Sequence, residues 1–216
     1  MTRLSNVVLA TRNVGKAREF ERLLEGALQV EPLAAEIEMP EETGTTFAEN
    51  ARLKAEAVFT ALGGERAVLA DDSGLDVRAL GGRPGVLSAR YAGPAAVDED
   101  NVAKLLADLH DSSDRAARFV CALCLLLPPL ESGTCAEEGV VGPLMIEVTG
   151  EFTGRIEEAP RGGRGFGYDP VFRPTGWNET LAEAAPESKD AVSHRGAAAR
   201  ALRQALEERR LISHGA

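Results

Sequence analysis

The sequence predicts an α/β fold in which strands and helices alternate around one sheet. Short apolar runs at 6–10, 68–70 and 118–127 are typical of buried strands. Between them lie segments whose apolar residues recur with a helical period, and no repeat, low-complexity tract or long linker interrupts the 216 residues. This length suits one large domain, 1–216, or two small lobes.

The N-terminal part of the chain begins with a predicted strand at Asn6–Ala10, followed by a polar loop and a helix. A capping box, Thr46-x-x-Glu49, predicts the start of a second helix, which Gly63-Gly64 ends. The expected apolar face of this helix comprises Phe47, Ala51, Ala55, Val58, Phe59 and Leu62, with Arg52, Lys54 and Glu56 largely off it.

The later part of the chain continues the alternation. A helix is expected at Asp98–His110, where Val102, Leu105, Leu106 and Leu109 are spaced for one face. Strands are expected at 118–127, 143–148 and 151–156, and a last helix from about Arg195 to Arg210. The segment 161–169 is too rich in glycine to form a packed element.

Composition excludes several classes of partner. A net charge of −10 and a pI near 4.9 argue against non-specific binding to nucleic acid or to an anionic membrane. Three cysteines do not make a disulfide framework, and Cys121 and Cys124 lie in an apolar run, where buried thiols are expected. That run is far short of a bilayer span, and the N-terminus lacks the apolar core of a signal peptide. We therefore expect a cytoplasmic protein.

The stretch from Val68 to Tyr91 is the most unusual part of the sequence. A short strand, Val68–Ala70, runs directly into Asp71 and Asp72, and neighbouring strand residues point to opposite faces unless the chain bends. Gly74 makes a bend at the strand end possible. Acids at a strand end, followed by glycine turns and arginines, indicate a hard metal ion with a phosphorylated ligand, and the alternative is an acidic surface turn.

Three other polar stretches carry chemistry that is unusual for loops. The first, Thr11–Lys16, places Lys16 in the first turn of a helix, where free N–H groups and the helix dipole favour anions, although it is not a Walker A loop. The second puts Phe166 between two glycines, either as a stacking face for a flat ligand or as a loop residue tucked into the core. The third, 187–196, clusters basic residues just before a helix.

Six motifs occur in register from about Val7 to Leu206, nearly the full chain. They are T-x-N-x-G-K, E-E-T-G-x-T-F-x-E-N-A-x-x-K-A, A-D-D-S-G-L, L-G-G-x-P-G-x-x-S-A-R-Y, G-F-G-Y-D-P-x-F and S-H-R-G-x-A. Each motif alone is weak, but together they make the chain resemble the HAM1-like family, the inosine/xanthosine triphosphate pyrophosphatases that hydrolyse non-standard purine nucleoside triphosphates.

The resemblance implies a two-lobed α/β fold with a long central mixed sheet, a nucleotide cleft between the lobes, and a homodimer. It also implies a reaction that uses Mg²⁺. A nucleoside triphosphate is cut between its α- and β-phosphates, which gives the monophosphate and pyrophosphate and keeps deaminated purines out of DNA and RNA.

The resemblance further implies roles for individual residues. Asp72 is expected to bind the metal and to accept the proton of the attacking water, with Lys16 also in the catalytic set. Asp71 and either Glu41 or Glu42 would complete the metal site. Substrate contacts are expected from Thr11, Arg12, Asn13, Val14, Gly15, Lys16, Asn50, Ser73, Arg90 and Lys189, and at the base and sugar from Phe166, Gly167, Tyr168, Asp169, His194 and Arg195. Asn50 has the alternative of being a solvated helix residue.

These residue types suit the reaction. Mg²⁺ prefers oxygen ligands and is commonly held by one or two carboxylates plus substrate phosphates. A pocket that presents fixed donors to the O6 atom of hypoxanthine or xanthine would leave buried groups unpaired with adenine, at about 1–3 kcal/mol per group. Two positions depart from the family pattern: Arg12 stands where many relatives have glycine, and Leu87 replaces a frequent aromatic residue.

Two alternatives are weaker. A phosphatase of the haloacid dehalogenase kind would need D-x-D-G-T, whereas the next acid after Asp72 is Asp76. A nucleotide- or Ca²⁺-binding module is the non-enzymatic alternative, but an EF-hand loop that begins at Asp71 would need an acid where Gly82 stands.

Overall fold

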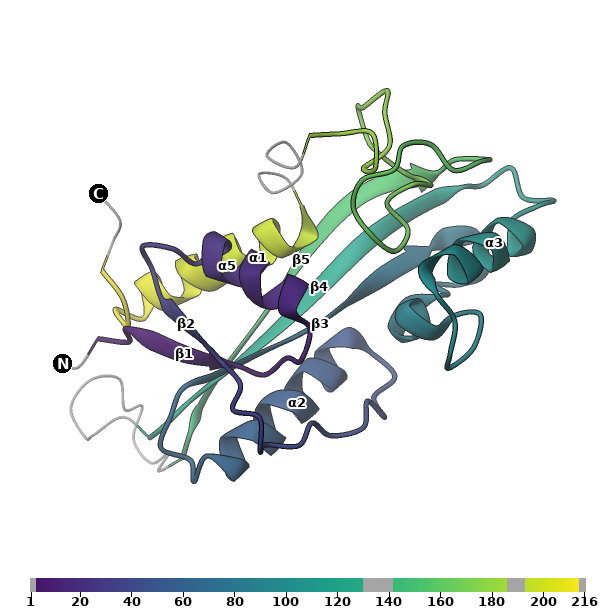
Figure 1. Ribbon diagram of the computed structural model, residues 1–216. Coiled ribbons are helices and arrows are strands. Elements are labelled where there is room, and N and C mark those ends of the chain that lie inside the picture. The colour runs from purple at the N-terminus through teal and green to yellow at the C-terminus, as the bar shows by residue number, and fades with distance from the viewer. Residues whose placement is uncertain (1–2, 130–141, 186–192, 214–216) are drawn as a thin grey trace. The chain divides into compact units, whose positions relative to one another are not determined.

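The computed structural model describes residues 3–129, 142–185 and 193–213 (Figure 1). Contacts within the chain divide it into two compact units. Among the described residues, the first unit comprises 3–72, 122–129, 142–150 and 198–213, and the second comprises 73–121, 151–185 and 193–197. None of the helices in these ranges has the length and apolar character needed to cross a membrane.

The strands form one six-stranded mixed sheet, which confirms the predicted α/β class. β1 pairs in parallel with both β2 and β3, whereas β5 and β6 are antiparallel. In sheet order the strands are β2 (Gln29–Pro32), β1 (Asn6–Leu9), β3 (Val68–Val77), β4 (Ala116–Leu127), β5 (Leu144–Ile156) and β6 (Phe172–Pro174).

The first unit places helices on both faces of its part of the sheet. α1 (Val14–Leu23) and α5 (His194–Glu208) lie on one face, and α2 (Phe47–Ala61) lies on the other (Figure 1). Phe20 of α1 and Leu202 of α5 are completely buried, as are Ala51, Ala55 and Val58 of α2. The apolar faces predicted from helical periodicity therefore cover the strands.

α2 confirms one prediction and corrects another. Thr46 is the N-cap, its side chain accepts a hydrogen bond from the Glu49 N–H, and the Glu49 carboxylate accepts from the Thr46 N–H, so the capping box is formed. Lys54, however, was expected off the apolar face and is instead 5% exposed. A lysine is buried in this way only when its ammonium group meets charged partners, and the partners are carboxylates described below.

The second unit is built around α3 (Asp98–Asp108) and the aromatic residues of three strand segments. Val102, Leu105 and Leu109 of the predicted helix are buried in one cluster with Phe119 and Phe172, whose ring centroids lie 4.7 Å apart. Two 3-10 helices, Arg78–Leu80 and Gly85–Arg90, follow β3.

Four strands, β2, β3, β5 and β6, differ from the prediction in extent or in being unpredicted. β3 was predicted only at Val68–Ala70 and continues through Asp71, Asp72 and Gly74 to Val77, so Gly74 lies within the strand. β5 is one strand where two were expected. β2 and β6 were not predicted, because they are short, lie at the two edges of the sheet and end at prolines, which removes the apolar run on which a strand prediction depends.

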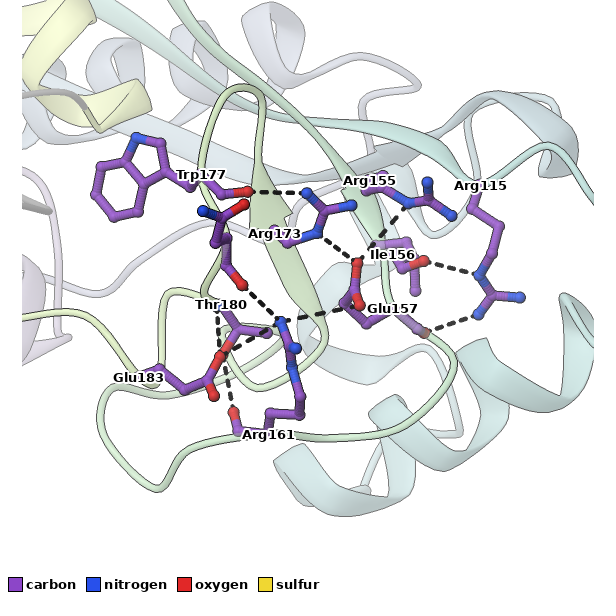
Figure 2. A network of polar contacts seen from close by, with 10 residues as sticks. Arg115, Arg155, Ile156, Glu157, Arg161, Arg173, Trp177, Thr180 and Glu183 are labelled. Atoms are coloured by element: carbon purple, nitrogen blue, oxygen red, sulfur yellow. Dashed lines mark hydrogen bonds and ion pairs between the residues drawn. The ribbon is translucent and has the colours of Figure 1, made fainter.

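Polar contacts fix the long 157–184 segment of the second unit (Figure 2). Arg173 donates to the Glu157 carboxylate at 2.7 Å and to the Trp177 carbonyl at 2.8 Å, and the Thr180 hydroxyl donates to the Arg161 carbonyl at 2.8 Å. Arg115 donates to the carbonyls of Ile156 and Glu157. We call Arg115, Glu157, Arg161, Arg173, Thr180 and Glu183 the stem network, because they join both ends of this segment.

Candidate functional site

Asp71 and Asp72 point to opposite faces of the first unit, as strand alternation requires without a bend. The Asp71 carboxylate is completely buried and lies 2.8 Å from the Lys16 ammonium of α1. Asp72 meets α2, where it accepts hydrogen bonds from Asn50 at 3.1 Å and from Lys54 at 3.2 Å. The two adjacent acids thus have separate sets of partners.

The loop after β1 is folded by its own side chains. Asn13 is the N-cap of α1, and its side-chain oxygen accepts from the Lys16 N–H at 3.0 Å. The Thr11 hydroxyl accepts from the Asn13 N–H at 3.2 Å. Lys16 therefore lies in the first helical turn, as predicted, and the exposed Val14 and Gly15 present the helix N-terminus.

Lys54 joins two carboxylates that the sequence had placed in the metal site. Its ammonium nitrogen lies 3.2 Å from Asp72 and 2.9 Å from Glu42. Glu41 is exposed, whereas Glu42 is half-buried and directed at this ammonium group. A positive charge thus lies between Asp72 and Glu42, and oxygen atoms of both face it at hydrogen-bond distance.

Asn50 is completely buried, so the expectation of a solvated residue is wrong. Its amide nitrogen donates to Asp72, and its oxygen accepts from the Gly44 N–H at 2.8 Å. A Cβ atom at Gly44 would lie 2.7 Å from that oxygen, so only glycine permits this approach. Asn50 thus orients one oxygen of the Asp72 carboxylate. A substrate contact from Asn50 stays a prediction.

Burial and neighbouring charges shift the proton affinity of this cluster. Burial raises the pKa of Asp72, and the Glu42 charge raises it further, while Lys54 and Asn50 act in the opposite direction. For Lys54, burial alone would lower the pKa, but the charges of Asp72, Asp71 and Glu42 raise it above its ordinary value. Lys54 remains protonated, and Asp72 binds a proton more readily than an exposed aspartate.

Arg12 has a different surrounding from the one expected of a phosphate ligand. Its guanidinium group donates to the carbonyls of Leu33, Ala34, Ala35 and Ile37. The side chain therefore ties the loop after β1 to the 33–37 segment. A substrate contact from Arg12 stays a prediction.

Residues 165–169 of the second unit form a tight turn that exposes one aromatic ring. The Asp169 carboxylate accepts from the Phe166 N–H at 3.1 Å, and the Asp169 N–H donates to the Phe166 carbonyl. Asp169 and Tyr168 are buried, and the Tyr168 hydroxyl donates to the Ser88 carbonyl at 2.8 Å. Phe166 is 56% exposed, so the expectation that it is tucked into the core is wrong.

Arg195 is the predicted residue that contacts this turn, and it also contacts Ser73. The Arg195 guanidinium lies 5.7 Å from the centre of the Phe166 ring and donates to the Ser73 hydroxyl at 3.0 Å. The His194 ring stacks on Phe119 with a centroid distance of 5.0 Å. Arg90 ends the second 3-10 helix and is half-buried. Lys189 lies outside the described residues.

Comparisons with known proteins assign the chain to a family. A family model described as the Ham1 family matches residues 7–205. The chain belongs to the Ham1 family. A relative from Geobacillus kaustophilus, named dITP/XTP pyrophosphatase, is 46% identical over 210 residues, which cover 95% of this chain and 96% of the relative. A Bacillus subtilis protein of the same name is 43% identical over 94% of this chain and 98% of its own.

Two solved structures have a similar fold. The Staphylococcus aureus Ham1 protein has a TM-score of 0.80 at 38% identity and covers 94% of this chain and 99% of its own. A Mycobacterium abscessus structure, named nucleoside-triphosphatase / dITP/XTP pyrophosphatase, has a TM-score of 0.72 at 42% identity and covers 93% and 98%. Membership in the Ham1 family sets aside the dehalogenase-type phosphatase and the Ca²⁺-binding module.

Sequence reasoning missed Lys54 and Gly44 as parts of this Ham1 site. Both stand in the quoted motif that begins at Glu41, so the signal was present. A lysine beside apolar helix positions, followed in the chain by an apolar strand that carries adjacent acids, is the pattern that would have identified Lys54.

Proposed function

We propose that this enzyme hydrolyses non-standard purine nucleoside triphosphates, dITP, ITP, XTP and dXTP, to the monophosphate and pyrophosphate. The proposal depends on one observation above all, the buried Asp72 held between the Asn50 amide and the Lys54 ammonium. It is supported by relatives named dITP/XTP pyrophosphatase that are 41–47% identical to the chain. Removal of such nucleotides cleanses the pool from which DNA and RNA are made.

Asp72 is proposed to accept the proton of the water that attacks the α-phosphorus. Its raised pKa makes it a better base than an exposed aspartate while Lys54 and Asn50 fix its two oxygen atoms. Lys16 and the N-terminus of α1 would bind the triphosphate and offset the negative charge that develops on the departing pyrophosphate. Thr11 and Asn13 hold this loop in shape.

The donor set fits a divalent cation, and we propose Mg²⁺. Carboxylate oxygens of Asp72 and Glu42 converge on one buried positive charge, the Lys54 ammonium, and this convergence of two acids supports a cation beside them. Among the residues that the structure describes, no three His, Cys, Asp or Glu side chains form a metal cage, as suits an ion held by one or two carboxylates and by substrate phosphates. When bound, Mg²⁺ would supply charge neutralisation and acidify the attacking water.

Glu42 rather than Glu41 is proposed as the second carboxylate, because only Glu42 is directed at the cation beside Asp72. The matched pair Glu42→Gln and Glu41→Gln tests this choice. We expect the Mg²⁺ concentration for half-maximal activity to rise about 10- to 100-fold for Glu42→Gln and to stay near the wild-type value for Glu41→Gln. The reverse order would assign the metal to Glu41.

Base recognition is proposed for the second unit. The exposed Phe166 ring offers a stacking face, and Arg195 beside it offers donors for the O6 atom that hypoxanthine and xanthine share. Adenine carries an amino group at that position and would leave such donors unpaired. His194, Tyr168 and Asp169 would support these two side chains through the stacking and hydrogen bonds described above.

We further propose that the chain is a single domain, that it forms a homodimer and that it is cytoplasmic. Light scattering of the purified protein tests the dimer, for which a mass near twice 22.9 kDa is expected. A monomer that turns over substrate at the full rate would contradict it.

Product analysis tests the function directly. The purified protein is incubated with Mg²⁺ and, in parallel, with ITP, XTP, ATP and GTP, and the products are separated by ion-exchange chromatography. Monophosphate and pyrophosphate from ITP and XTP, with ATP and GTP nearly intact, are expected. Orthophosphate as the product would refute the proposed reaction, and equal turnover of all four nucleotides would refute the proposed selectivity.

A further inference from the structure

The turn at Phe166–Asp169 is closed mainly by groups of its own. Asp169 accepts from the Phe166 N–H through its carboxylate and donates to the Phe166 carbonyl through its own N–H. The Gly167 N–H has a partner from another element. It donates to the carboxylate of Asp98 at 2.6 Å.

Asp98 is carried by a rigid element. It is the first residue of α3, whose Val102, Leu105 and Leu109 are buried in the core of the second unit. A negative side chain at the start of a helix is also favoured by the helix dipole, so the carboxylate is held there at little cost. The backbone N–H next to Phe166 is therefore fixed relative to the core through Asp98.

We propose that Asp98 is a positioning residue for base recognition, a role that rests on the function proposed above for Phe166. The hydrogen bond to Gly167 sets the orientation of the peptide that follows Phe166, and hence the direction of the exposed ring. A ring already oriented for stacking loses less conformational freedom when the base binds. Asp98 thus acts on affinity for the nucleoside part of the substrate and leaves the phosphate chemistry unchanged.

The stem network makes this effect local. It holds both ends of the 157–184 segment through Arg173, Glu157, Arg161 and Thr180 (Figure 2). Each of these hydrogen bonds and ion pairs joins two residues of the segment itself. Tyr168 is anchored separately by its hydrogen bond to Ser88. Loss of the Asp98 contact should consequently loosen Phe166 and Gly167 while the rest of the segment keeps its place.

Three variants of the full-length protein test the proposal. Asp98→Ala removes the acceptor, Asp98→Asn keeps an acceptor oxygen without the charge, and Glu99→Ala removes a neighbouring exposed acid of the same helix turn as a matched control. We expect the KM for ITP to rise about 3- to 10-fold in Asp98→Ala with kcat nearly unchanged, since one hydrogen bond is lost. Asp98→Asn should restore most of the affinity, and Glu99→Ala should resemble the wild type.

Two further readouts separate positioning from a general loss of structure. Inhibition by inorganic tripolyphosphate, which lacks a base, should be equally strong in all variants, because Asp98 does not act on the phosphate side. The hydrogen-exchange rate of the Gly167 amide, measured by NMR without nucleotide, should rise in Asp98→Ala only. An unchanged KM in Asp98→Ala, or a loss of kcat and of tripolyphosphate inhibition together, would overturn the proposal.

Failure of the proposed function is recognised independently. A wild-type protein that leaves ITP and XTP intact would refute the function, and with it the role of Asp98 in base recognition. The exchange rate of the Gly167 amide would still establish whether Asp98 holds the turn. Slow exchange in Asp98→Ala combined with an active wild type would refute the Asp98 contact alone.

Discussion

The acids of β3 and the turn at Phe166–Asp169 are built in contrasting ways. Around Asp71 and Asp72, charged side chains on regular strands and helices are buried and paired with Lys16, Lys54 and Asn50. In the turn, backbone N–H groups are held by side chains, and one apolar ring is exposed. Chemistry on phosphates needs concentrated, oriented charge, whereas recognition of a flat base needs a shaped backbone and a stacking face. The two regions should therefore respond differently to substitution.

The largest effect is expected from Asp72→Asn. Loss of the carboxylate proposed as general base should lower kcat for ITP by about 10²- to 10⁴-fold. The amide of asparagine preserves the shape of the side chain and thereby the fold. Asp76→Asn is the matched control, because Asp76 lies on the same strand but pairs with the half-exposed Arg118. Steady-state assays measure kcat, and circular dichroism shows whether each variant is folded. Activity retained in Asp72→Asn would exclude Asp72 as the base.

The next largest effect is expected from Lys54→Met, this time on stability. Removal of the buried ammonium leaves the Asp72 and Glu42 carboxylates facing each other, which should reduce the free energy of unfolding by about 3–5 kcal/mol. Urea unfolding at pH 7 measures this change, and Mg²⁺ should recover part of it. The control Lys104→Met breaks an exposed pair with Asp108 and should have little effect. Equal losses of unfolding free energy in Lys54→Met and Lys104→Met would refute the role of Lys54 as a buried counter-charge.

A smaller effect is expected from Phe166→Ala in the turn. Base stacking on an aromatic ring contributes about 1–3 kcal/mol, so the KM for ITP should rise about tenfold. Stability should not change, because the ring is 56% exposed. Leu87→Ala removes another exposed apolar side chain of the second unit and serves as the control. A KM that rises equally in both variants would argue against stacking on Phe166.

The smallest effect is expected from Glu157→Gln in the stem network, and it should depend on pH. The hydrogen bond from Arg173, with the charges of Arg173, Arg161 and Arg155, lowers the pKa of Glu157 below 4.5. A carboxylate with a depressed pKa in the folded state stabilises the protein above its unfolded pKa, and the stabilisation is lost as pH falls through the folded pKa. The free energy of unfolding of the wild type should therefore exceed that of the variant by about 1 kcal/mol at pH 7. This difference should disappear at acidic pH below 4.5. A gap that does not depend on pH would show that the charge of Glu157 is not responsible.

The two regions also differ in how far the sequence predicted them. Thr46, Glu49 and Lys16 were placed correctly because helix starts depend on local hydrogen bonds that neighbouring residues determine. Lys54 and Asn50 were misjudged because their burial depends on Asp72, which is distant in the chain. Periodicity assigns a polar side chain to the surface unless a partner is known.

The turn shows the same limit more strongly. Its glycines predicted an irregular segment, and the structure agrees, but no local pattern indicated that Asp98 or Ser88 would hold it. The exposure of Phe166 also followed from long-range packing, since Tyr168 two residues later fills the core in its place. Edge strands β2 and β6 were missed for a related reason, because their pairing comes from neighbours in the sheet.

The separate partners of Asp71 and Asp72 make the proposed catalytic arrangement depend on the register of β3. A slip of β3 by one residue would turn every side chain to the other face. In one direction Asp72 would take the place of Asp71 beside the lysine of α1, and in the other Asp71 would take the place of Asp72 beside the lysine and amide of α2. A chain that folds in either shifted register would keep both acids, but neither acid would retain its own partners. Single-residue insertions and deletions between Val68 and Asp71 should accordingly be far less tolerated than substitutions, because they separate both acids from their partners at once.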